Sequence, residues 1–229
     1  INETYKAMLG GKSVIRTLSE YATARGTEIG YDNVFDYSLG NPSVPCPSSF
    51  TKAMIDMYET ADPVALHGYS PSLGNPEACR TIAESLNRRF GMDYTAGHIF
   101  PTTGAAGALA HALRAVTKPG DEVLTFAPYF PEYHPYVEGA GARLTVVPAD
   151  IESFQINFAA FEAALNPEVA VVLINTPNNP SGAVYSAETL TRLAEILRGQ
   201  RQIPLQNQHA EGGFGNASRA QSVAGQMFG

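Results

Sequence analysis

Two short stretches of this chain combine residue types that suit ligand binding better than regular secondary structure. The stretch "NTPNNPSG" at 175–182 follows the apolar run "VAVVLI" and contains three asparagines and two prolines. Because prolines fix the backbone, an asparagine amide here can point at a ligand instead of capping its own turn. A turn of Asn and Pro between a strand and a helix would use the same residue types, so spacing alone leaves both interpretations open.

The second stretch is "TTGAAGAL" at 102–109, which precedes an Ala- and Leu-rich segment. Its small residues let the backbone amides of Ala105 and Ala106 approach an anion, and a helix N-terminus favours phosphate. A plain glycine turn before a helix is the alternative. The stretch lacks the third glycine of the dinucleotide fingerprint and a clear acidic residue about twenty positions on, which disfavours a nicotinamide-dependent oxidoreductase.

These stretches lie in a region where strands and helices are expected to alternate. Apolar strands are expected at 121–128, 143–149 and 169–174, and helices at 102–116, 157–166 and 186–198. Strands that are apolar throughout and separated by helices predict an α/β fold with a mostly parallel sheet covered on both faces. Ligands of such sheets bind beyond the carboxyl ends of the strands, and the two stretches suit that edge.

The first ninety residues are expected to be mainly helical. Helices are predicted at 3–9, 12–24, 49–60 and 76–90, and the prolines of 35–47 predict an extended segment. In the last helix, Ala78, Ile82, Leu86 and Phe90 repeat every four residues, which predicts one buried face.

Composition excludes several classes of function. Hydrophobic residues make up 44% and charged residues 16% of the chain, as in ordinary globular proteins. A net charge of −7 argues against a nucleic-acid or membrane partner, which needs a basic face, and no apolar run is long enough to span a bilayer. Two distant cysteines and scattered histidines predict a reduced, cytoplasmic protein without a metal site.

The motifs together resemble one family. "NTPNNPSG" resembles the asparagine signature of the class I/II, fold-type I aminotransferases, which depend on pyridoxal phosphate, and aspartate-aminotransferase-like bacterial members are most similar. Four more stretches match in order: "YSLGNPSVPCP", "GYSPSLGNPEACR", "FPTTGAAGAL" and "KPGDEVLTFAPYFPEY". The resemblance extends from residue 1 to about 205. It implies the fold-type I architecture, a parallel sheet between helices with a small domain that is incomplete here.

The resemblance also implies roles in cofactor binding. Asn179 would donate a hydrogen bond to the phenolic oxygen of the cofactor ring, and the amides of Ala105 and Ala106 would bind its phosphate. Phe130 would stack on the pyridine face, although Tyr129 is adjacent and the assignment can slip by one position. Core packing is the alternative role for Phe130.

Two further residues have implied roles outside this group. Tyr69 resembles the tyrosine that reaches the phosphate in the partner subunit, which implies a homodimer with shared sites; core packing is its alternative. Gly40 resembles the glycine whose backbone lies against the substrate carboxylate. The substrates implied are an amino acid and a 2-oxo acid, and the sequence does not choose which ones.

Three groups that transamination needs are missing from this sequence. The family places its Schiff-base lysine, its pyridinium-binding aspartate and its carboxylate-binding arginine after the asparagine signature. All four lysines (Lys6, Lys12, Lys52 and Lys118) precede that signature, and the last aspartate is Asp150. After "IPL" the family pattern stops at "QNQHAEGG", which predicts a truncation, frameshift or gene misprediction near residue 205.

This interpretation divides the chain into three segments. They are an arm with part of the small domain at 1–47, the first part of the large cofactor-binding domain at 48–205, and an unrelated, disordered tail at 206–229. The expected product is an inactive fragment of an aminotransferase. A non-catalytic remnant that binds the cofactor, or that dimerises with a full-length enzyme, is the alternative.

Overall fold

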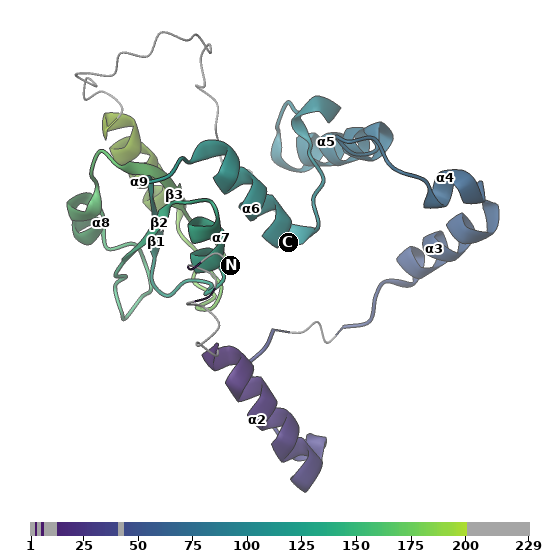
Figure 1. Cartoon of the computed structure of the whole chain (residues 1–229), viewed down its shortest axis with the longest axis horizontal. Helices are drawn as coiled ribbons and strands as arrows, with labels where there is room; N and C mark the ends of the chain where they lie inside the picture. The colour runs from purple at the N-terminus through teal and green to yellow at the C-terminus, as the bar shows by residue number, and fades with distance from the viewer. Residues whose placement is uncertain (1–2, 4–5, 7–12, 41–43, 201–229) are drawn as a thin grey trace. The chain divides into compact units, whose positions relative to one another are not determined.

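The structure, a computed structural model, describes residues 3, 6, 13–40 and 44–200. It divides into two compact units, residues 1–78 and 79–229, each with its own set of elements (Figure 1). The three predicted segments and their boundaries stay predictions. The segment 206–229 and the strand start predicted at "IPL" lie outside the described residues.

The first unit consists of helices joined by extended chain. Its elements are α2 (Val14–Ile29), η1 (Tyr31–Asn33), α3 (Ser48–Thr60) and α4 (Pro63–His67). Helix α2 continues five residues beyond the predicted end at Ala24 and stops before Gly30, whose φ of 88° ends the helical turn. The unpredicted α4 begins where the Asp62 side chain accepts a hydrogen bond from the Ala65 amide, with Pro63 in the first turn.

The second unit shows the predicted alternation of strands and helices. From the helix that leads into it onward, its elements are α5 (Pro76–Phe90), η2 (Ala96–His98), α6 (Gly104–Val116), β1 (Glu122–Phe126), α7 (Tyr133–Gly139), β2 (Arg143–Val147), α8 (Phe158–Ala164), β3 (Val169–Leu173) and α9 (Ala187–Gln200). The short elements η2 and α7 were not expected. Helix α7 has only seven residues, includes Pro135 and shows no helical periodicity.

The three strands form one parallel sheet in the order β2-β1-β3. The central strand β1 is buried at all five positions, Glu122 and Thr125 included, as expected for a strand covered on both faces. The hydroxyl of Thr125 on β1 donates a 3.0 Å hydrogen bond to the carbonyl of Leu173 on β3, so the one uncharged polar side chain of β1 is satisfied inside the sheet.

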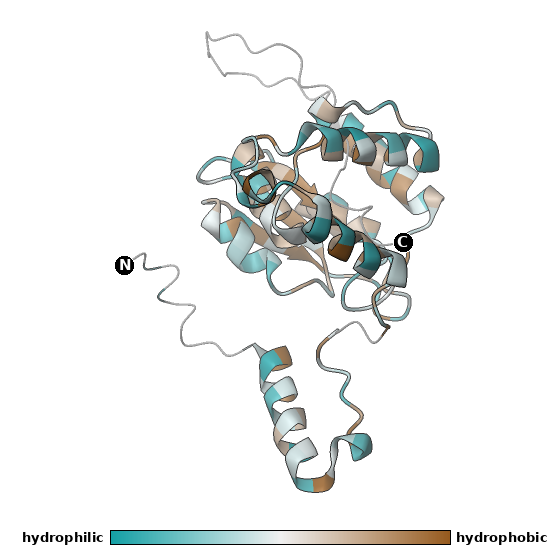
Figure 2. Ribbon diagram, turned by 90° about the vertical axis from the view of Figure 1, so that its right-hand side faces the viewer, coloured by the Kyte–Doolittle hydropathy of each residue, from teal (hydrophilic) through white to brown (hydrophobic). Residues whose placement is uncertain are grey.

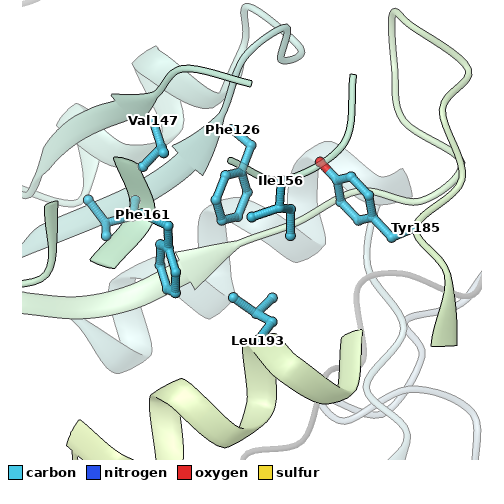
Figure 3. Close-up of a cluster of buried hydrophobic side chains, with 7 residues drawn as sticks. Phe126, Val147, Ile156, Phe161, Tyr185 and Leu193 are labelled. Atoms are coloured by element: carbon cyan, nitrogen blue, oxygen red, sulfur yellow. The ribbon is translucent and has the colours of Figure 1, made fainter. Parts of the chain in front are cut away.

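Helices cover both faces of this sheet, which confirms the predicted α/β architecture. Successive residues of a strand point to opposite faces, and here Leu124 and Val123 enter two different clusters. The cluster with Leu124 contains Phe161 of α8 and Leu193 of α9, together with Phe126, Val147, Ile156 and Tyr185 from strands and loops (Figure 3). The cluster with Val123 contains Leu113 of α6 and Tyr133 and Val137 of α7, together with Ala142 and Leu173. Figure 2 shows the hydrophobic strands between these helices.

The helix faces were predicted with unequal success. In α9, Leu193 is buried and Leu190 and Leu197 pack against the same cluster, as their spacing predicts. In α5, the buried residues are Cys79 and Ala83. Ile82 and Phe90 remain 41% and 39% exposed, so the predicted buried face is wrong. An apolar repeat identifies a stripe on a helix but not the neighbouring surface that covers it. Among the described residues, no helix is long and apolar enough to cross a membrane.

Candidate functional site

The candidate site lies at the carboxyl edge of the parallel sheet. Strands β1 and β3 are neighbours and run in the same direction, so the chain leaves both of them at one edge. The segment after β1 contains Phe130, and the segment after β3 contains Asn179. The structure therefore brings these two predicted site residues to the same edge of the sheet, although 49 positions in sequence separate them.

Two asparagines hold the loop after β3 in shape. The Asn175 side chain accepts a 2.7 Å hydrogen bond from the backbone amide of Asn179. The backbone of Asn178 accepts from the Gly182 amide at 2.7 Å and donates to the Ala183 carbonyl at 2.9 Å. The turn interpretation of "NTPNNPSG" is thus right for Asn175, and the ligand-binding interpretation stays a prediction.

The Asn179 side chain differs from its neighbours. Asn179 is exposed, and within the described part of the chain its side-chain amide makes no hydrogen bond. The backbone amide of the same residue is fixed by Asn175, so the side chain projects from a held backbone. This arrangement leaves a donor and an acceptor available to a ligand.

The Asn178 side chain links the two loops. Its amide donates to the carbonyl of Pro128, in the segment after β1, at 2.9 Å, and to the Ser181 hydroxyl at 2.8 Å. The sequence pattern predicts no role for Asn178. A polar side chain adjacent to a predicted ligand contact was the available signal, but the pattern gave no indication of its partner 50 residues earlier.

Phe130 has one side in the core. It is partly buried, packs against the cluster that contains Val123 and Val137, and contacts the Tyr133 ring edge-on at 5.8 Å. Tyr129 stacks on the same Tyr133 ring at 6.4 Å and 21°. Core packing, the alternative role for Phe130, is therefore present, and partial exposure leaves room for a ligand contact as well.

Three tyrosines in or next to these loops have a raised hydroxyl pKa. Burial raises the pKa of Tyr133 and of Tyr185, and burial together with the charge of Glu132 raises the pKa of Tyr136. Tyr185 also donates its backbone amide to the Thr176 hydroxyl at 3.0 Å, which ties it to the asparagine loop. These tyrosines stay protonated near neutral pH and add no negative charge to the edge.

Ala105 and Ala106 occupy the first turn of α6. The Thr103 side chain makes no capping hydrogen bond, and both alanines are exposed, so first-turn amides remain available to an anion. Five residues separate the end of α6 from β1, and Leu113 near the C-terminal end of α6 is buried in the cluster with Val123.

Tyr69 and Gly40 belong to the first unit and are described within that unit alone. Tyr69 is fully exposed, so packing in the core of its own unit, the alternative role, is wrong. A Cβ atom added to Gly40 would meet nothing within 4 Å, so packing does not require glycine there. Both predicted roles stay predictions.

Lys118, the lysine of the second unit, lies away from the site. Lys118 precedes β1 at the amino edge of the sheet, where its ammonium pairs with the Asp121 carboxylate at 2.8 Å. Lys52 is in α3 of the first unit. No group of three His, Cys, Asp or Glu side chains in the described ranges could hold a metal ion.

Comparison with known proteins gives one consistent family. Residues 32–227 match the family model for aminotransferase class I and II. A probable N-succinyldiaminopimelate aminotransferase of Mycobacterium tuberculosis is 34% identical over 192 residues, which cover 80% of this chain and 47% of that protein. An aspartate aminotransferase of Streptomyces avermitilis is 30% identical over 188 residues, 82% of this chain and 45% of that protein.

Solved structures agree with the sequence matches. An aminotransferase from Eubacterium rectale superimposes with a TM-score of 0.83 at 44% identity, covering 87% of this chain and 50% of that one. The aspartate aminotransferase of Rhizobium meliloti gives a TM-score of 0.74 at 31% identity, covering 83% and 46%. The chain thus spans about half the length of these relatives and carries part of their fold. The predicted resemblance is confirmed: the chain belongs to the class I and II aminotransferase family.

Proposed function

We propose that the whole protein transfers amino groups between an amino acid and a 2-oxo acid with pyridoxal phosphate as cofactor. The observation that carries the proposal is the carboxyl edge of β1 and β3. There, a hydrogen bond joins the loop of Asn179, whose side-chain amide is unpaired among the described residues, to the loop of the partly buried Phe130. The family match supports the same activity. Pyridoxal phosphate, when bound, supplies the electron sink for reactions at the amino acid Cα.

The residues of this edge fit the cofactor. The Asn179 amide can donate to an anionic ring oxygen, and the exposed side of Phe130 can contact a flat aromatic ring. The first-turn amides of Ala105 and Ala106 offer donors and a positive helix end to a phosphate dianion. Each group would bind or orient the cofactor, and none of them is a base that could move a proton.

The positions of the lysines in this chain favour binding of the cofactor without turnover of substrate. All four precede the asparagine loop, and Lys118 is paired at the opposite edge of the sheet. Covalent attachment and proton transfer need a lysine amine at the site. We propose that this chain by itself binds the cofactor without covalent attachment and does not catalyse transamination.

The proposal also gives Tyr69 a role toward a partner subunit and Gly40 a role toward the substrate. The full exposure of Tyr69 suits a residue that completes the phosphate site of a second subunit in a homodimer. The open surroundings of the Gly40 backbone suit contact with a substrate carboxylate. Cys46 and Cys79 are not joined by a disulfide, which fits the reduced cytoplasm.

Spectroscopic titration of the purified chain with pyridoxal phosphate tests the proposal. We expect saturable binding, observed as a shift of the cofactor absorbance band, and no stoichiometric adduct after borohydride reduction and peptide mapping by mass spectrometry. Absence of saturable binding contradicts the proposed cofactor role. A single-site adduct on Lys6, Lys12, Lys52 or Lys118 together with amino-acid turnover contradicts the proposed inactivity.

A further inference from the structure

We propose that Asn178 is a positioning residue, which sets the distance between the ring-contacting loop after β1 and the hydrogen-bonding loop after β3. The inference rests on the proposed cofactor site and adds a residue that touches no ligand itself. Its basis is the hydrogen bond from the Asn178 amide to the Pro128 carbonyl at 2.9 Å.

Asn178 is held on its own loop before it reaches the other one. Its backbone N–H donates to the Ala183 carbonyl and its backbone carbonyl accepts from the Gly182 amide. One hydrogen of its side-chain amide goes to Ser181 in the same loop, and the other goes to Pro128 in the loop after β1. Because three hydrogen bonds fix Asn178 within the loop after β3, its fourth bond, to Pro128, holds the loop after β1 at a set distance from that loop.

The two ends of this link flank the proposed ligand contacts. Pro128 is two residues before Phe130, and Asn178 directly precedes Asn179. The strands themselves are tied one step earlier by the hydrogen bond from Thr125 to Leu173. The paired residues of β1 and β3 end at Thr125 and Leu173, and beyond them the Asn178 amide joins the two loops by a hydrogen bond to the Pro128 carbonyl.

The chemistry of the link explains why an asparagine is required. A carbonyl oxygen and a hydroxyl must both receive a donor from one side chain, and a primary amide has two N–H groups in a fixed plane. Aspartate has the same shape, but it would place a carboxylate oxygen against the Pro128 carbonyl and repel it. Alanine would remove both bonds and leave the Pro128 carbonyl without its partner.

The test compares three variants with the parent chain: Asn178→Ala, Asn178→Asp and Ser181→Ala. Ser181→Ala removes the hydroxyl within the loop but keeps the link to Pro128. Asn166→Ala is the matched control, because the Asn166 amide also donates to two oxygens, from Glu122 and Ala164, before β3 at the opposite edge. Circular dichroism identifies any variant that fails to fold.

The first measurement needs no ligand. Hydrogen exchange followed by mass spectrometry should show faster exchange in both 127–133 and 176–183 for Asn178→Ala and Asn178→Asp, with β1 unchanged. Ser181→Ala should accelerate exchange in 176–183 only. Parent-like exchange of 127–133 in both Asn178 variants overturns the link.

The second measurement is the affinity for pyridoxal phosphate by absorbance titration. Both Asn178 variants should bind at least about fivefold more weakly than the parent, whereas Asn166→Ala should bind as the parent does. If the parent binds and both Asn178 variants bind equally well, the positioning role is wrong and the proposed function stands. If the parent does not bind, the proposed cofactor site is wrong and the positioning role falls with it.

Discussion

The three asparagines of the loop after β3 illustrate how one residue type serves different tasks within five positions. Asn175 accepts a bond that shapes the turn, Asn178 donates across to the neighbouring loop, and Asn179 keeps its side chain unpaired among the described residues. The difference follows from where the fixed backbone directs each side chain. Only the exposed amide can serve a ligand without loss of loop structure.

Replacement of Asn179 by alanine should therefore separate binding from stability. The variant loses a donor to an anionic ring oxygen, a bond of about 1.5–3 kcal/mol, so affinity for pyridoxal phosphate should fall about tenfold or more. The free energy of unfolding should change by less than about 0.5 kcal/mol because the side chain is exposed. Absorbance titration and urea unfolding check the two effects. A stability loss that equals the loss of binding energy contradicts a direct ligand contact.

Glu122 is a buried carboxylate at the amino edge of the sheet. It is 3% exposed and accepts hydrogen bonds from Thr145, from Asn166 at 2.8 Å and from Arg143 at 3.0 Å. Burial raises the pKa of its carboxyl, but the three donors outweigh burial and hold the pKa below its ordinary value.

The lowered pKa of Glu122 gives the sign of a pH effect. The ionised form is stabilised in the folded state, so its contribution is present above the ordinary glutamate pKa and is lost as pH falls through the lower, folded-state pKa. Urea unfolding between about pH 6 and pH 3 should show this loss, and Glu122→Gln should make the dependence shallower. At pH 7 that variant should be about 2 kcal/mol less stable. Equal pH slopes in both chains contradict the assignment.

At the scale of elements, the strands could be predicted and the short helix α7 could not. The fully apolar β3 and the residues Val123, Leu124 and Phe126 of β1 favour strands buried on both faces, although β1 also contains Glu122 and Thr125. Helix α7 has seven residues with a proline inside, and packing against β2 and α6 stabilises it instead of an apolar repeat. For α5, the repeat indicated Ile82 and Phe90, whereas the structure buries Cys79 and Ala83.

The same division applies to the candidate site. The residue types of "NTPNNPSG" and the helix start at 104–106 were readable as ligand-binding loops, and the family resemblance added Phe130, Tyr69 and Gly40. The hydrogen bond from Asn178 to Pro128 joins positions 50 apart, so no local pattern contains it. Contacts of that kind require the strand order β2-β1-β3, which the sequence alone did not provide.

Replacement of Phe161 tests how much the packing of α8 against the sheet contributes to stability. Its side chain is completely buried and its ring meets that of Phe126 at 5.5 Å (Figure 3). Phe161→Ala should lower the free energy of unfolding by about 3–5 kcal/mol, because it removes apolar contact and leaves a cavity. Val184→Ala is the control, since Val184 is 62% exposed and should change stability by less than about 0.5 kcal/mol. Similar losses in the two variants would contradict the described core.

At the scale of the molecule, the two units differ in how their helices are stabilised. The second unit has a buried central strand with hydrophobic clusters on both faces. In the first unit, α3 has no buried residue and Phe50, Ile55 and Tyr58 are more than half exposed. A helix of thirteen residues is marginal in water without a covered apolar face, so α3 depends on contacts that its own unit does not supply.

Native-state hydrogen exchange of this chain at low concentration should therefore separate the two units. Amides of β1 open only with global unfolding, so their exchange should be slowed by a factor on the order of 10³ or more. Amides of α3 should exchange within about tenfold of the unfolded rate, because a thirteen-residue helix frays when no tertiary contact holds it. Equal protection of α3 and β1 would contradict this expectation. If that protection rose with protein concentration, a second copy of the chain would be the surface that covers α3, as the proposed homodimer requires.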